Sequence, residues 1–358
     1  MADKARIGII GTGWWATTAH FPAVLSHPEA ELVAAADLRP DILGKAAEAY
    51  GVERTYTDFR EMLEKEQLDG AVVAVWHAEH FEVARTCLES GLHVMLEKPM
   101  VLRAAHAREL VELSRAKGRE LIVGYPWHFT PHTLRAREVV QSGELGPVLL
   151  VNSVFASMVL QFLRGDDQTY RPRFDYPVVG PGDVYADIEK SGGGQGHLQV
   201  THSAGLALFV TGARPVRTTA LMENLDVATD VVDAISARLD NGALASVAST
   251  GAIRHGDPEW LRTDIVCERG QVSLDSLAGT GTVTHPDHSV ETLEPLAGDD
   301  AIYPMQATAS NLVDVITGSA ENGSPAEVGW RTVELLDSAY RSAAEGGRPV
   351  DVEELYSE

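Results

Sequence analysis

A glycine-rich turn near the N-terminus restricts the possible folds of this chain more than any other feature. The segment Gly11-Thr12-Gly13-Trp14-Trp15-Ala16 lies between an apolar run at 6–10 and a helical pattern that continues to about residue 25. In such a turn the first glycine permits a sharp bend, and the second lets backbone amides approach a pyrophosphate. The small third residue lets the helix pack on the strand. The pattern favours a dinucleotide-binding turn over a glycine-rich turn of an unrelated α/β fold.

The first 125 residues continue this alternation of strand and helix. Short apolar runs lie at 6–10, 31–36, 70–75, 93–97 and 120–124, and helical patterns at 42–50, 57–64, 80–90 and 105–117. Helices that cross over between successive strands are typical of parallel sheets with both faces covered. We therefore predict a doubly wound parallel sheet, an α/β Rossmann domain, over residues 1–125.

The pattern changes over residues 126–358, which we predict to be a second, α+β domain. A helix at 131–142 and a strand at 147–156 precede a polar loop at 165–191, three glycines and an apolar helix to about residue 211. Mostly consecutive strands follow between 215 and 292, with a hairpin at Asp240-Asn241-Gly242, and helices at 304–317 and 326–344 close the domain. Consecutive strands predict an open-faced, mostly antiparallel mixed sheet with helices on one face.

Composition excludes several other classes of protein. The 358 residues carry a formal net charge of −23, which disfavours binding to nucleic acid. No apolar run approaches the roughly 20 residues that span a bilayer, and no signal-peptide pattern is present, so we expect no membrane association and a cytoplasmic location. Cys87 and Cys267 are expected to be buried thiols. The closely spaced histidine pairs lack an obvious third ligand, so no metal is expected; they are His77 with His80, and His285 with His288.

The cofactor preference depends on two residues after the second strand. Asp37 follows Gly13 by 24 positions, close to where an acidic residue binds the ribose hydroxyls of NAD. Its carboxylate would repel the 2′-phosphate of NADP, but Arg39 could pair with that phosphate or stack on adenine. Asp37 could instead cap a helix. We expect NAD, with NADP possible. Of Trp14 and Trp15, one is expected to pack on the sheet and the other to line the nicotinamide pocket.

Three motifs, in order along the chain, resemble those of the Gfo/Idh/MocA family, the glucose–fructose oxidoreductase and inositol dehydrogenase group. They are GLHVMLEKP at 91–99, SGELG at 142–146, and SGGG at 191–194 followed by His202. The resemblance implies a Rossmann domain joined to an open-faced sheet through which oligomers form, here a dimer or tetramer. It implies hydride transfer between a nicotinamide and a secondary alcohol or ketone, usually of a carbohydrate.

The same resemblance implies roles for the motif residues. Lys98 lies at the carboxyl end of a parallel strand, where such sheets place their active sites, and a lysine with a lowered pKa can accept the hydroxyl proton. His202 matches the catalytic histidine of the family. Glu97 would position the cofactor, and Pro99 would follow a cis peptide bond. His77 and His80 are expected on the cofactor side.

The chain also departs from the family pattern. Leu198 stands where the family has an aspartate four residues before the histidine, so Gln199 is expected to share the helical face of His202 and bind substrate hydroxyls. Without a carboxylate, His202 is expected to be mostly neutral. His128 lies where an arginine often precedes the phenylalanine. We expect substrate contacts from Tyr125, His128, Gln199 and His202.

Two functions remain open on this basis. The first is an NAD(P)-dependent dehydrogenase or reductase that acts on a sugar, glycoside or cyclic polyol, with Lys98, His202 and Gln199 as the catalytic group. The second is a non-catalytic NAD(P)-binding regulator or accessory subunit, which the missing aspartate would permit.

Overall fold

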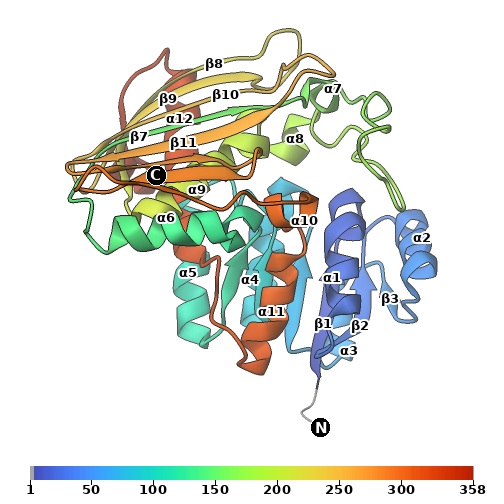
Figure 1. Cartoon of the computed structure of the whole chain (residues 1–358). Helices are drawn as coiled ribbons and strands as arrows, with labels where there is room; N and C mark the ends of the chain where they lie inside the picture. Colours follow the sequence, from blue (N-terminus) through green and yellow to red (C-terminus); the bar gives the residue numbers. More distant parts are fainter. Residues whose placement is uncertain (1–3, 358) are drawn as a thin grey trace.

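The computed structural model describes residues 4–357 and contains two sheets, one parallel and one mixed (Figure 1). The parallel sheet has the order β3-β2-β1-β4-β5-β6. Its strands are β1 (Ala5–Ile10), β2 (Ala30–Ala36), β3 (Thr55–Tyr56), β4 (Gly70–Val73), β5 (His93–Leu96) and β6 (Leu121–Val123). All four residues of β4 are buried, as expected for a strand covered on both faces. The predicted doubly wound sheet is confirmed.

Helices cover both faces of the parallel sheet. On one face lie α3 (Phe59–Lys65), α4 (His80–Glu89) and α5 (Ala104–Lys117). On the other lie α1 (Phe21–Ser26), α2 (Pro40–Tyr50) and α11 (Ala307–Thr317). Helix α11 follows the second sheet in the chain but packs beside α1 against β1, β4 and β5 (Figure 1). Its apolar residues Ala309, Leu312 and Val313 therefore complete the core of the first sheet, which the sequence division at residue 125 did not anticipate.

The second sheet has nine strands in the order β14-β13-β12-β11-β7-β10-β9-β8-β15. Only β7 and β10 pair in parallel, so the expected mostly antiparallel mixed sheet is confirmed. The strands are β7 (Val148–Ala156), β8 (Pro215–Glu223), β9 (Val232–Leu239), β10 (Leu244–Thr250), β11 (Trp260–Cys267), β12 (Gln271–Asp275), β13 (Thr280–Thr284), β14 (Val290–Thr292) and β15 (Val350–Asp351).

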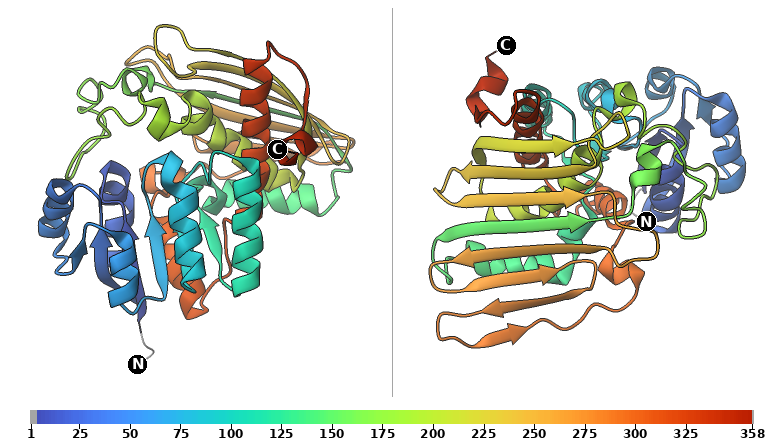
Figure 2. Two further views of the ribbon diagram at one scale, coloured as in Figure 1. Left: turned by 180° about the vertical axis from the view of Figure 1, so that it is seen from behind. Right: turned by 90° about the horizontal axis from the view of Figure 1, so that it is seen from above.

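One face of this sheet is open. Helices α6 (Pro131–Gln141), α9 (Thr201–Thr211) and α12 (Ala326–Ala344) lie behind it in the right-hand view of Figure 2. Residues of β9 alternate strictly between exposed and buried along the strand, as expected when a single face meets the core. Cys87 and Cys267 are buried free thiols, as expected. Among the described residues, no helix is long and apolar enough to cross a membrane.

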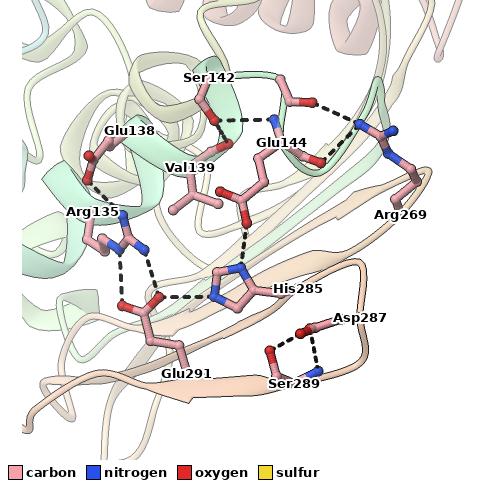
Figure 3. A network of polar contacts seen from close by, with 11 residues as sticks. Arg135, Glu138, Val139, Ser142, Glu144, Arg269, His285, Asp287, Ser289 and Glu291 are labelled. Atoms are coloured by element: carbon pink, nitrogen blue, oxygen red, sulfur yellow. Dashed lines mark hydrogen bonds and ion pairs between the residues drawn. The ribbon is translucent and has the colours of Figure 1, made fainter.

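An ion-pair network fastens α6 to the edge of the open sheet (Figure 3). The guanidinium of Arg135 forms two hydrogen bonds to the Glu291 carboxylate, at 3.0 and 2.8 Å. The ring nitrogens of His285 lie 2.6 Å from a carboxylate oxygen of Glu144 and 3.1 Å from one of Glu291. These two acids raise the pKa of His285. The sequence did not show that two carboxylates would meet this histidine.

Candidate functional site

The glycine-rich turn forms a groove at the carboxyl ends of β1 and β4. Gly11 has φ of +89°, and a Cβ there would lie 2.3 Å from the carbonyl oxygen of Ala74, so the protein itself requires glycine. At Gly13 the nearest atom to a Cβ would be a guanidinium nitrogen of Arg39, at 3.5 Å. The protein leaves this second position open, which fits the close approach of a pyrophosphate. The helical segment η1 (Ala16–His20) begins at the end of the turn and directs its amino end toward the groove.

Asp37 and Arg39 line the same groove as a pair. The Asp37 carboxylate accepts from the amide of Thr12 at 2.8 Å, and two Arg39 side-chain nitrogens donate to it at 2.9 Å each. Burial acts to raise the pKa of Asp37, but the hydrogen bonds from Arg39 and Thr12 outweigh burial and lower it. Asp37 does not cap α2, because the N-cap residue of α2 is Arg39 and no side-chain hydrogen bond caps that helix. Asp37 is therefore an ionised groove residue, and Arg39 is already engaged by it.

Trp14 and Trp15 both line the groove and the neighbouring cavity. The Trp14 ring packs on Phe162 and Phe174, with centroid distances of 5.4 and 5.6 Å, and Trp15 lies 6.2 Å from Tyr303. The expectation that one of the two tryptophans packs on the parallel sheet is wrong. The loop between residues 164 and 187 instead folds over the turn and supplies aromatic partners.

Lys98 follows β5 and points into the cavity between the two sheets. A cis peptide bond joins it to Pro99, as the resemblance implied. Its Nζ donates to the carbonyl oxygen of Leu198 at 2.9 Å. Burial lowers the pKa of Lys98 to about 8, against the opposing effect of Glu97. A lysine with this pKa can exchange a proton near neutral pH.

Glu97 is held from two sides below Lys98. One carboxylate oxygen accepts from the backbone amide of Lys98 at 3.0 Å, and the other lies 2.9 Å from Nε2 of His20. Burial acts to raise the pKa of Glu97, but the contact with His20 outweighs it and lowers the pKa. His20 was not among the residues predicted from the sequence. Its position in the first helix carries no local signal, because its partner is 77 residues away.

The cavity has a volume of about 800 Å³ and brings Lys98, Gln199 and His202 together. Gln199 and Leu198 lie in a π-helical turn, η4 (Gly196–Val200), and His202 is the second residue of α9. The wide turn presents both the Leu198 carbonyl and the Gln199 side chain to the cavity. The residue at the family's aspartate position thus contacts Lys98 through its main chain.

His202 is almost fully buried and its Nδ1 atom has no hydrogen-bond partner among the described residues. Its ring lies edge-on to Trp127 with a centroid distance of 5.2 Å. Burial, together with the nearby Lys98, holds the pKa of His202 well below its usual value. This agrees with the expectation of a neutral His202, although the main cause is burial.

One buried carboxylate, that of Asp230, anchors the glycine-rich segment beneath this turn. The two oxygens of Asp230 accept from the amides of Gly194 and Gly196, at 2.7 and 2.6 Å, and one also accepts from the Tyr340 hydroxyl at 2.8 Å. A Cβ on Gly194 would lie 2.0 Å from the carbonyl oxygen of Asp230, so only glycine fits. Burial and the neighbouring Asp230 raise the pKa of Asp233 well above its usual value.

Two of the three other histidines near this site hold backbone carbonyl groups. His77 and His80 line the cavity, but a ring nitrogen of His77 lies 2.9 Å from the carbonyl oxygen of Ser191, and one of His80 lies 2.8 Å from that of Pro99. His197 faces the Tyr340 ring at 4.4 Å and does not line the cavity. Within residues 4–357 no group of three or more metal-binding side chains occurs.

Tyr125 and His128 lie elsewhere than expected. The Tyr125 hydroxyl is 2.9 Å from the Thr201 hydroxyl inside the core, and the His128 ring stacks on Phe209 at 4.0 Å. Neither residue lines the cavity. The short turn after β6 directs both side chains beneath α9, so the expected substrate contacts from Tyr125 and His128 are corrected. Trp127, which lies between these two residues in the sequence, faces the cavity instead.

These features define a two-domain dinucleotide-binding protein. The parallel sheet carries a phosphate-binding turn, and a cavity with a half-buried lysine lies between it and the open-faced sheet. The model of the "Oxidoreductase family, NAD-binding Rossmann fold" matches residues 5–125, and that of the "GFO/IDH/MocA C-terminal domain" matches residues 133–273. The chain belongs to the Gfo/Idh/MocA oxidoreductase family, and its first domain is an NAD-binding Rossmann domain.

Named relatives include the D-glucoside 3-dehydrogenase of Escherichia coli, 32% identical over 42% of this chain and 43% of the relative. The myo-inositol 2-dehydrogenase of Thermotoga maritima is 25% identical over 78% of this chain and 77% of the relative. The matches to the first three curated relatives span 43% to 60% of their lengths. The solved structure of levoglucosan dehydrogenase in complex with NADH has a TM-score of 0.82, 18% identity, and coverage of 98% of this chain and 99% of that one. It shares the fold.

Proposed function

We propose that this protein is an NAD-dependent dehydrogenase that oxidises a secondary alcohol of a sugar, glycoside or cyclic polyol. The observation that carries the proposal is the meeting of Lys98, Gln199 and His202 in one cavity that adjoins the dinucleotide groove. The relatives named above act, by their names, on a glucoside and on myo-inositol. These are cyclic compounds with several secondary alcohols, and they support the substrate class.

The groove residues fit a dinucleotide with its pyrophosphate at Gly11 and Gly13. The carboxylate of Asp37 would accept from the ribose hydroxyls and would repel a 2′-phosphate, which is why we propose NAD. A bound nicotinamide would supply the acceptor for the hydride, which leaves the substrate carbon with its electron pair.

The side chains of this protein handle the proton. Neutral Lys98 accepts it from the substrate hydroxyl, while the Leu198 carbonyl holds the lysine nitrogen in place. His202 is neutral and hydrogen-bonds the same oxygen, and Gln199 binds a neighbouring hydroxyl. In the reverse direction protonated Lys98 returns the proton to the carbonyl oxygen.

The test is the formation of reduced nicotinamide, followed by its absorbance, across a panel of monosaccharides, methyl glycosides and inositols with NAD or NADP. We expect turnover of at least one compound, and we expect Lys98→Met to lose that turnover. Dinucleotide binding without turnover of any compound would replace the proposal by a non-catalytic regulator or accessory subunit of the same fold.

We also propose that the open sheet face forms a homo-oligomer. Leu150, Leu221, Val232 and Leu244 lie exposed on β7, β8, β9 and β10, and large apolar residues of this kind on one face are typical of interfaces. Light scattering coupled to size exclusion is expected to give a dimer or tetramer, and Leu244→Lys is expected to shift the mass toward the monomer.

A further inference from the structure

The cavity at Lys98 is unusually rich in aromatic side chains. Eight of them line it, and they come from the glycine-rich turn, the turn after β6, β7, helix α7 (Leu160–Leu163), the loop that folds over the groove, and the segment before α11. They are Trp14, Trp15, Trp127, Phe155, Phe162, Phe174, Tyr185 and Tyr303. The apolar C–H faces of one sugar ring cover only one or two aromatic rings, so this lining offers more apolar surface than a single sugar covers.

Most polar side chains in the cavity already have partners. His77, His80 and Glu97 bond to the protein, and Arg173 pairs with Glu259 near the opening. Free hydrogen-bonding capacity remains at Lys98, at His202 and at Gln199, whose side chain makes no hydrogen bond to any described residue. The hydroxyls of Tyr185 and Tyr303 add to it. These groups are enough to hydrogen-bond the hydroxyls of one sugar ring.

The aromatic part of the cavity extends beyond these groups. Trp14 and Phe174 are half-buried and lie 5.6 Å apart in edge-to-face contact, with Phe162 beneath both at 5.4 and 5.7 Å. Exposing such rings to water is unfavourable, and an apolar ligand group would cover them. The cavity volume of about 800 Å³ has to hold the nicotinamide end of the cofactor as well as the substrate.

The charges around the cavity restrict the ligand further. Asp257, Glu259 and Asp299 line it, and Arg173, a cation of this rim, is already paired with Glu259. A phosphate next to these carboxylates would be repelled, which disfavours a phosphorylated or nucleotide-linked group there. The remaining cation of the lining is Lys98, which the proposed function assigns to the substrate hydroxyl.

We propose that the substrate is an uncharged glycoside with an aromatic aglycone, whose sugar lies at Lys98, Gln199 and His202 and whose aromatic ring lies against Trp14 and Phe174. The proposal rests on the proposed function for the reaction itself. It adds a second binding region for a planar apolar group.

The kinetic test compares phenyl and methyl β-glycosides of glucose, galactose and mannose, so that each pair differs only in the aglycone. We expect KM for the phenyl member of the oxidised pair to be lower by about tenfold or more, because the ring covers apolar surface that a methyl group does not reach. Phe174→Ala is expected to bring the two KM values together.

The matched control is Phe81→Ala, because Phe81 is a half-buried phenylalanine stacked on His106 outside the cavity. This control variant is expected to keep the difference between the two KM values. Equal KM values in the natural protein, or a difference that survives Phe174→Ala, would overturn the proposal.

A binding test separates this proposal from the proposed function. The same pairs are titrated against the intrinsic tryptophan fluorescence, with and without NADH, since Trp14, Trp15 and Trp127 all line the cavity. Tighter phenyl binding that Phe174→Ala removes, without turnover, would keep the aromatic subsite and reject the dehydrogenase. Turnover with equal binding of phenyl and methyl members would keep the dehydrogenase and reject the subsite. Equal binding in every pair rejects the subsite whatever the turnover.

Discussion

The ionisation of Lys98 gives a quantitative prediction for the pH dependence of the reaction. Its pKa is lowered to about 8 by burial, and only the neutral amine can accept the hydroxyl proton. The neutral fraction is about a tenth at pH 7 and about nine-tenths at pH 9, so kcat/KM for oxidation should rise about tenfold between them. His202 should add no second inflection, because its pKa lies well below neutrality. In the direction of reduction the protonated form is needed, and kcat/KM should fall over the same interval.

Lys98→Met is the matched perturbation, because it keeps most of the side-chain volume and removes the amine. We expect turnover to fall by about 10²–10⁴-fold and the pH dependence to disappear, with far less change in NAD affinity measured by fluorescence. Folding stability gives an independent check. The folded protein binds the lysine proton less tightly than the unfolded chain, so the natural protein is destabilised below about pH 8 and gains stability as the pH rises. The thermal midpoint of Lys98→Met at pH 7 should therefore equal or exceed that of the natural protein.

A rate of oxidation that is independent of pH between about 6 and 9 would refute this assignment. So would an inflection near pH 8 that persists in Lys98→Met, because another group would then accept the proton.

Three further predictions concern the groove, the cavity and its anchor. Asp37→Ala should weaken NAD binding and improve NADP binding, and titration of both dinucleotides by fluorescence checks it; tighter NADP binding to the natural protein would contradict the proposed preference. Gln199→Ala should lower kcat/KM clearly, whereas Leu198→Ala should act mainly on stability because it keeps the carbonyl that holds the lysine; equal effects of both on kcat/KM would count against this role of Gln199. Asp233→Asn should leave the thermal midpoint unchanged or higher, because burial and Asp230 disfavour the charged form of this carboxyl, and its two oxygens have no hydrogen-bond partner among the described residues; a lower midpoint for the asparagine variant would contradict this reasoning.

The parts of the molecule that could be predicted from the sequence are those whose conformation and function depend on residues close together in the chain. The turn from Gly11 to Ala16 binds through its own backbone, and its glycines and flanking strand and helix can be read directly from the chain. The position of Lys98 could be predicted for a similar reason, because the end of a parallel strand places a side chain at the active edge of the sheet whatever the rest of the fold does. The alternation of strand and helix in the first domain, and the hairpin at Gly242, are likewise local.

Contacts between distant segments were decided only by the tertiary structure. Whether His128 or Trp127 faces the cavity depends on which side of a short turn packs beneath α9, and hydrophobic periodicity does not determine orientation in so short a turn. The pairing of His20 with Glu97, and of Asp230 with the glycines at 194 and 196, joins residues between 34 and 77 positions apart. The aromatic side chains of the cavity come from six separate segments. The sequence alone determined the local turns and the alternation of elements because these depend on neighbouring residues, whereas burial and shape at the cavity arise only when the two sheets close on each other.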